Sequence, residues 1–124
     1  MSQDFRQKHK PTEIRLKREE KILEIDFEDG QTFALPAELL RVESPSAEVQ
    51  GHSPDQKKTV PGRRHVGIMG LEAVGKYAIR IKFDDLHDTG IFSWDLLYHL
   101  GAEQDVIWQQ YLDALAEQDL SRDP

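Results

Sequence analysis

The sequence contains no cysteine. A chain without cysteine forms no disulfide, has no thiolate nucleophile, and holds no sulfur-ligated zinc ion or iron–sulfur cluster with its own side chains. Long hydrophobic runs are also missing. No stretch approaches the roughly 18 apolar residues of a membrane span, and the first residues lack the apolar segment of a secretion signal. We therefore expect a cytoplasmic protein that does not associate with membranes.

Positive charge is scarce, because 16 lysines and arginines face 23 aspartates and glutamates, which leaves a formal net charge of -7. Binding to phosphate backbones requires a basic face, so this balance argues against a general nucleic-acid binder. The nearby residues Lys57, Lys58, Arg63 and Arg64 leave room for a local basic patch. Since no aromatic side chain lies among these residues to stack on bases, nucleic acid is not an expected partner.

Recognisable catalytic motifs are lacking as well. No serine lies in a Gly-x-Ser-x-Gly elbow, and the glycine-rich residues 67–76 lack the Gly-Lys-Ser/Thr ending and the spacing of a phosphate-binding loop. None of the five histidines belongs to a metal-binding helical pair. We therefore expect no enzymatic activity and no cofactor.

What the sequence does contain is the patterning of one folded domain. Alternating apolar and polar residues predict strands at residues 12–17, 21–27, 31–35, 65–71, 77–83 and 91–92. Pro36 suits the first turn of a helix at 36–41, and Ser93 is a suitable cap for a helix that ends at Gly101. A last helix is predicted at 103–118, with Trp108, Tyr111, Leu112 and Leu115 on one buried stripe.

A degenerate internal repeat organises these elements. Ile25-Asp-Phe-Glu-Asp recurs as Ile81-Lys-Phe-Asp-Asp, and each copy leads through a strand into a helix that contains two adjacent leucines. One such unit cannot bury its apolar face alone, so we expect the two units to pack together. The predicted fold class is α+β, with an antiparallel sheet from two β-hairpin–helix units plus a C-terminal helix that is either a lid on the core or an arm.

The predicted domain organisation follows the same pattern. Residues 11–101 form the domain, residues 1–10 a disordered tail, residues 102–120 the C-terminal helix, and residues 121–124 a disordered end. The stretch from 48 to 64 is rich in glycine, proline, serine, glutamine and lysine, which predicts a long surface loop.

Six segments together resemble a known family. They are Ile14-Arg-Leu, Leu23-Glu-Ile-Asp-Phe-Glu-Asp-Gly, Leu35-Pro-Ala-Glu-Leu-Leu-Arg, Ser44-Pro-Ser-Ala-Glu-Val, Gly51-His52 and Phe83-Asp-Asp-Leu-His-Asp-Thr-Gly-Ile-Phe-Ser-Trp. In combination they resemble the small bacterial DUF971 proteins, which are similar to the N-terminal domain of γ-butyrobetaine and trimethyllysine hydroxylases. The resemblance covers about residues 11–101.

In those hydroxylases the domain precedes an iron- and 2-oxoglutarate-dependent catalytic domain, and three cysteines and a histidine hold a structural zinc ion. The resemblance places the cysteines at Ser44, Ser46 and Val49 and the histidine at His87. Serine is a poor zinc ligand and valine is none, so this degenerate zinc site cannot hold the metal. The resemblance therefore implies the fold without the zinc and without the catalytic domain.

A related domain is attached to Mrp-like P-loop ATPases that carry iron–sulfur clusters. By this association the resemblance implies an accessory role beside an Mrp-like ATPase, the iron–sulfur machinery or an oxygenase-type partner. We hypothesise a non-enzymatic protein-interaction or adaptor module. The candidate partner-binding residues are Arg41, Ser44, Ser46, His52, Asp85, His87, Asp88 and Trp94.

Two alternatives compete with this hypothesis. In the first alternative, Trp94 and Phe92 are core residues that do not contact a partner, and His87 only stabilises its own turn through hydrogen bonds. In the second alternative the protein binds a metal ion through His52, His65 and His87 with acidic turn residues, since imidazole and oxygen ligands suit nickel, zinc or iron. His52 and His87 are weak candidates, and no metal is expected.

Overall fold

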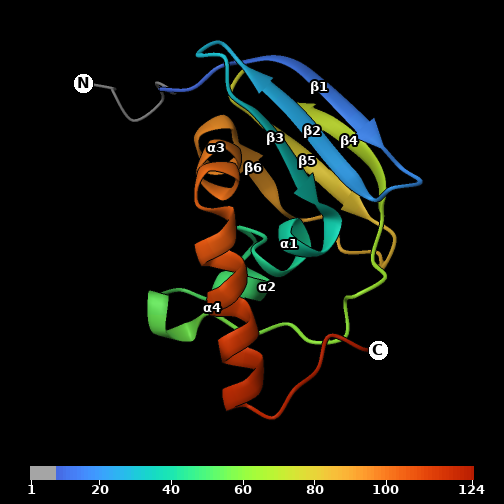
Figure 1. The fold of residues 1–124 in the computed structure, drawn as a ribbon, viewed down its shortest axis with the longest axis vertical. Helices are drawn as coiled ribbons and strands as arrows, with labels where there is room; N and C mark the ends of the chain where they lie inside the picture. The colour runs from blue at the N-terminus through green and yellow to red at the C-terminus, as the bar shows by residue number, and fades with distance from the viewer. Residues whose placement is uncertain (1–7) are drawn as a thin grey trace.

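Alternation of apolar and polar residues builds the first of two antiparallel sheets. In the computed structural model, which describes residues 8–124, strands β1 (Pro11–Lys17), β2 (Ile22–Phe27) and β3 (Thr32–Pro36) pair in this order (Figure 1). Leu23 and Ile25 of β2 are fully buried. Glu24 and Asp26 alternate with them onto the opposite face, where both carboxylates bind Arg15. This outer face is held by charge pairs.

The second sheet repeats this plan with β4 (Ile68–Val74), β5 (Ala78–Phe83) and β6 (Ile91–Ser93), again antiparallel and in sequence order. The α+β class is confirmed, and each hairpin–helix unit forms its own three-stranded sheet. The strand predicted at 65–71 begins and ends three residues later. Residues 72–74, which lie outside the predicted strand, belong to β4, because the reversal is made at Gly75 with a positive φ of 61°.

Among the residues that the structure describes, four α-helices complete the fold: α1 (Ala37–Val42), α2 (Ala47–Gln50), α3 (Trp94–Ala102) and α4 (Gln104–Glu117). The stretch predicted as a loop at 48–64 contains most of α2 and a 3-10 turn at Pro54–Gln56. The predicted cap of α3 is confirmed, since the Ser93 hydroxyl accepts a hydrogen bond from the Leu96 amide at 3.1 Å. Within residues 8–124, no helix has both the length and the apolar character that crossing a membrane requires.

Gly101 was predicted to end α3, but it lies inside the helix. Its φ is not positive, so it does not act as a left-handed helix end. A Cβ atom at this position would come within 2.3 Å of the Phe33 ring. Glycine is needed here because α3 approaches β3 closely.

The core lies between the two sheets and under α3. Its fully buried members include Ile25 and Leu35 from the first unit and Ile81, Phe92 and Leu97 from the second. The two repeat units therefore bury one shared apolar centre, as the repeat predicted.

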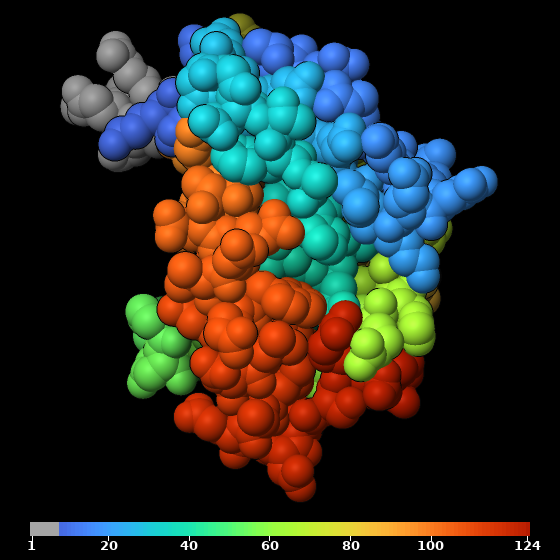
Figure 2. All heavy atoms as spheres, viewed as in Figure 1, coloured from blue at the N-terminus to red at the C-terminus, as the bar shows by residue number. Residues whose placement is uncertain are grey.

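The C-terminal helix is a lid on this core and not an arm. Ile107 joins the main core, while Tyr111 and Leu115 pack on Val42 in a second cluster. Trp108 and Leu112 of the predicted stripe are only partly buried. Figure 2 shows α3 and α4 (orange to red) as one continuous surface beside the first sheet.

Both ends of the described chain are held, in contrast to the prediction. The predicted tail lies mostly outside the described residues, but the amides of Lys8 and His9 both donate to the Asp95 carboxylate at 3.0 Å. The end at 121–124 was predicted to be disordered. Instead, the Ser121 carbonyl accepts from the Gly62 amide at 2.9 Å, because the chain turns back after α4.

Candidate functional site

Two serines and a histidine from distant parts of the sequence meet inside the protein. Ser44 Oγ lies 3.0 Å from His87 Nε2, and Ser46 Oγ lies 3.4 Å from the same nitrogen. The two hydroxyls are 3.3 Å apart. Ser44 is completely buried, and Ser46 and His87 are each 7% exposed. We refer to these three residues as the serine–histidine cluster.

Local sequence places each member. Ser44 follows the end of α1, and Ser46 is the N-cap residue of α2, with Pro45 between them. His87 lies in the acidic turn (residues 84–88) between β5 and β6, where its carbonyl accepts from the Phe83 amide at 3.0 Å. A Cβ atom at Gly90 would come within 2.3 Å of Ser44 Oγ. Only glycine lets the segment after the turn pass so close to the serine.

A charged network holds the acidic turn beside this cluster. Asp85 Oδ2 accepts from Arg41 Nε at 2.7 Å and lies 2.8 Å from Arg63 Nε. The other carboxylate oxygen accepts from the His87 amide at 3.1 Å. Burial by itself raises the pKa of Asp85, but the Arg41 hydrogen bond, the His87 amide and both arginine charges bring the pKa below its ordinary value. Asp85 is therefore ionised at neutral pH.

His87 is neutral in the folded protein at neutral pH. Burial lowers the pKa of its imidazole, and the positive charge of Arg41 lowers it further. The carboxylates of Glu48, Asp85 and Asp88 act in the opposite direction without reversing the shift. Nε2 faces the two serine hydroxyls, and Nδ1 lies 3.7 Å from Glu48 Oε2. The imidazole thus serves as a hydrogen-bonding partner inside the fold.

This lowered pKa makes stability depend on pH. In the unfolded chain His87 binds a proton near its ordinary pKa of 6.5, whereas the folded protein resists protonation. The free energy of unfolding should therefore fall as the pH drops below about 6.5, by at most about 1.4 kcal/mol per pH unit. Urea unfolding between pH 7.5 and 5 measures this dependence, and His87→Gln should flatten it. An identical pH dependence in the variant would contradict this role of His87.

The order serine, histidine, glutamate has the connectivity of a catalytic triad, with Ser44 near the imidazole and Glu48 on its far side. The resemblance grouped Ser44 with His87 as zinc-ligand positions, but the triad-like order with Glu48 was not predicted, because Ser44 and His87 lie 43 positions apart and in no known catalytic motif. However, Ser44 has no exposed surface, and Gly90 closes over its hydroxyl. A substrate carbonyl cannot reach this oxygen, so the geometry does not favour catalysis.

The same cluster occupies the place where the resemblance puts a structural zinc ion. The available donors are two hydroxyls and one imidazole, while Val49 is buried and offers no lone pair. These donors do not fit zinc, which takes thiolate, imidazole or carboxylate ligands in structural sites. Within residues 8–124, no group of three or more histidine or carboxylate side chains is arranged to hold a metal ion.

Six of the eight predicted site residues lie together, and the other two, His52 and Trp94, lie elsewhere. Arg41, Ser44, Ser46, Asp85 and His87 come together, and Asp88 lies exposed beside them in the acidic turn. His52 does not join them: it is exposed, and its amide donates to the Gln56 side chain at 2.8 Å. The metal-binding alternative therefore gains no support from the placement of His52 and His87.

Trp94 belongs to a different part of the surface. It is partly buried at the start of α3, packs on the core, and donates from Nε1 to the Lys76 carbonyl at 2.8 Å. Phe92 is completely buried, as the core alternative predicted.

Sequence reasoning also missed Leu86, at the centre of the acidic turn. Leu86 is 82% exposed, and its backbone has a positive φ of 73°. The visible signal was a large apolar residue among acidic ones in a predicted turn, where polar residues are usual. The left-handed conformation itself could not be read from the sequence.

The chain is similar in sequence and in fold to several known proteins. A family model described as gamma-butyrobetaine hydroxylase-like, N-terminal, matches residues 14–98. Two solution NMR structures, each 44% identical with a TM-score of 0.81, match 94% and 100% of this chain and 91% of theirs. A crystal structure of a DUF971 family protein of unknown function from Acidithiobacillus ferrooxidans is 39% identical, with a TM-score of 0.64. That match covers 76% of this chain and 94% of the other. No curated protein matches the chain.

Proposed function

Because this chain belongs to the gamma-butyrobetaine hydroxylase-like N-terminal family, we propose that it is a non-enzymatic interaction module that binds a protein partner through its acidic turn. The single observation that carries this proposal is the exposed Leu86 side chain in a left-handed backbone conformation. A bulky residue in this conformation costs on the order of 1 kcal/mol, and such strain persists only where neighbouring structure enforces it.

The neighbouring structure consists of the charged network and the serine–histidine cluster. Asp85 is held by Arg41 and Arg63, and His87 is held by Ser44. The residues on both sides of Leu86 are therefore anchored to the interior of the protein. An apolar side chain presented on a fixed backbone loses little conformational entropy when it enters a pocket, which favours binding.

The charges around Leu86 indicate the chemistry of the partner surface. Asp84 and Asp88 lie on either side of it and are both exposed. An apolar pocket with a basic rim would complement this turn, because complementary charge at the rim speeds association and selects the partner. In this proposal the buried residues of the predicted site position the turn, while Leu86, Asp84 and Asp88 make the contact.

The class of partner is proposed by association with related domains. An Mrp-like ATPase, a component of the iron–sulfur machinery or an oxygenase-type protein would each supply the cluster or metal that this chain has no cysteine to hold.

The test compares Leu86→Asp with a matched surface variant. Aspartate adopts the left-handed conformation more readily than leucine, so the variant should fold normally. Met69→Asp introduces the same charge at another exposed apolar residue, which is 56% exposed in β4. Wild-type and variant chains are used for affinity capture from cells, and the captured protein is then purified and titrated by calorimetry.

We expect Leu86→Asp to weaken the purified interaction by a factor of about 30 or more, as for a central anchor residue. Met69→Asp should leave the dissociation constant within a factor of about two of the wild-type value. The proposal fails if no captured protein depends on Leu86, or if both variants weaken binding equally.

A further inference from the structure

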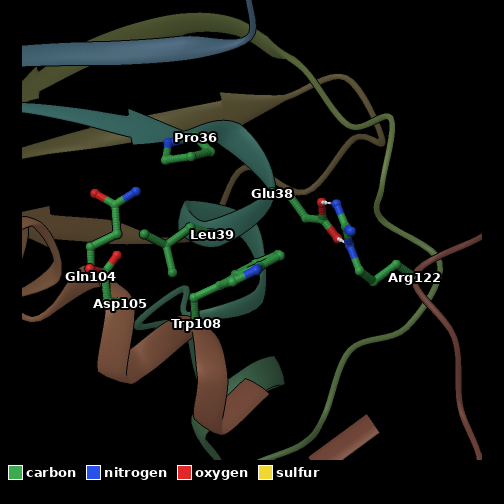
Figure 3. Close-up of a pocket in the computed structure, with 7 residues that line it drawn as sticks. All are labelled: Pro36, Glu38, Leu39, Gln104, Asp105, Trp108 and Arg122. Atoms are coloured by element: carbon green, nitrogen blue, oxygen red, sulfur yellow. Dashed lines mark hydrogen bonds and ion pairs between the residues drawn. The ribbon is translucent and has the colours of Figure 1, made fainter. Parts of the chain in front are cut away.

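A hollow of about 270 Å³ lies between α1 and the first turns of α4 (Figure 3). Pro36, Leu39 and Trp108 form its apolar walls, and Glu38, Asp105 and Arg122 contribute charged groups. Figure 3 shows Asp105 at one end and the Glu38–Arg122 pair at the other, with Leu39 and Trp108 between them. The acidic turn does not contribute to this hollow, so a ligand bound here is independent of the proposed function.

Arg122 reaches this hollow from the tail that extends beyond α4. Its Nε donates to Glu38 Oε2 at 2.8 Å and its Nη2 donates to Glu38 Oε1 at 2.7 Å. This is a two-bond pairing between guanidinium and carboxylate, a geometry that lysine cannot reproduce. The guanidinium carbon also lies 5.2 Å from the centre of the Trp108 ring, within cation–π range.

The backbone carbonyls of Arg122 and of the residue before it are also hydrogen-bonded to the rest of the protein. The Gly62 amide donates to the Ser121 carbonyl at 2.9 Å, and the Arg64 amide donates to the Arg122 carbonyl at 3.0 Å. These two donors hold two consecutive carbonyls of the tail, whose backbone bends at Arg122 and pairs with neither sheet. In Figure 2 the red tail lies against the yellow-green segment that contains these two amides.

Glu38 is suited to binding a cationic side chain. Glu38 is 7% exposed, in a helix whose other residues are also buried, whereas the Arg122 side chain remains 29% exposed. A buried carboxylate requires a cationic partner, and the arginine that supplies it arrives on a tail with one exposed face. Asp105 adds a second carboxylate, which makes no ion pair with any residue from 8 to 124.

We propose that Glu38, Trp108 and the amides of Gly62 and Arg64 form a recognition site for a short, arginine-containing peptide segment of a partner protein, and that residues 119–124 occupy it as a displaceable internal ligand. The occupant is defined by the contacts that the tail makes: a guanidinium on Glu38 and Trp108, and two consecutive carbonyls on the two amides. A tethered ligand competes at an effective concentration on the order of millimolar. The tail therefore sets the affinity that a partner segment must exceed.

The experiment uses full-length chains and the synthetic peptide DLSRDP, which has the sequence of residues 119–124. Nitrogen-15 spectra report binding through the Trp108 indole signal and the Gly62 and Arg64 amides. Arg122→Ala should bind the peptide at least tenfold more tightly than the wild-type chain, because the internal competitor has lost its guanidinium. A peptide with lysine in place of arginine should bind at least tenfold more weakly than DLSRDP.

Further variants make the outcome decisive. Adding Glu38→Gln to the Arg122→Ala chain should abolish saturable binding of DLSRDP. The control is Arg18→Ala, which removes an arginine that donates to the Met69 carbonyl and should bind DLSRDP as the wild-type chain does. Arg122→Lys keeps a positive charge on Glu38 and so preserves folding if Arg122→Ala does not. It too should bind DLSRDP more tightly than wild type. Equal binding of the two peptides, or equal binding by the wild-type chain and the folded Arg122 variants, would overturn the proposal.

Discussion

A variant carrying Ser44→Cys, Ser46→Cys and Val49→Cys should bind one zinc ion tightly and unfold at a higher temperature with zinc than without it. Ser44, Ser46 and His87 already meet within 3.4 Å. Ligand atoms around a tetrahedral zinc ion lie about 3.5 Å apart, so this spacing is compatible with the metal. Val49 is buried in the same short helix, where its amide donates to the Ser46 carbonyl at 3.1 Å.

The expected stabilisation is about 4 kcal/mol when free zinc is a thousand times the dissociation constant. Native mass spectrometry gives the stoichiometry, and thermal unfolding with zinc or with a chelator gives the shift. The control is the triple variant with His87→Ala, which should lose affinity by more than the roughly 10- to 100-fold cost of an outer-shell partner. A triple variant that folds but does not bind zinc would show that these positions do not correspond to the zinc ligands. Zinc affinity that is unchanged by His87→Ala would show the same.

The second large effect is expected at Phe92, where Phe92→Ala should lower the free energy of unfolding by about 3–5 kcal/mol. Phe92 is completely buried in β6, opposite Ile79 of β5, at the point where the second sheet meets the shared core. Removing the ring would leave a cavity among side chains from both repeat units.

The matched control is the preceding residue of the same strand. Ile91 lies on the opposite face of β6 and is 43% exposed, so Ile91→Ala should cost well under 1 kcal/mol. Urea unfolding of both variants at pH 7.5 measures the difference. Similar losses in the two variants would mean that the face assignment of β6 is wrong.

Local physics explains which parts of the fold were predictable. Period-two alternation predicted β2 and β5, because each has one face in the core and one in solvent. Ser93 predicted the start of α3, since a hydroxyl there satisfies an amide of the first turn. The prediction that α3 ends at Gly101 was wrong. A sequence does not distinguish a glycine that makes room for a neighbouring side chain, here Phe33, from a glycine that adopts a positive φ at a helix end.

The candidate site was also predictable only in part from the sequence. The resemblance selected Ser44, Ser46 and His87, and the sequence alone showed that these residues lack the thiolates zinc needs. It could not show that the hydroxyls and the imidazole bond to one another in a buried position. Nor did it identify Leu86 or the pairing of Glu38 with Arg122, which are 84 positions apart.

The amino-acid sequence by itself determined the two hairpin–helix units and excluded thiol chemistry, because alternation, capping and the absence of sulfur are properties of neighbouring residues or of composition. Only the tertiary structure decided that α4 covers the core, that Leu86 stands exposed on a braced turn, and that the tail returns to Glu38. Those features depend on packing between segments far apart in the chain, and no local pattern encodes the distance between them.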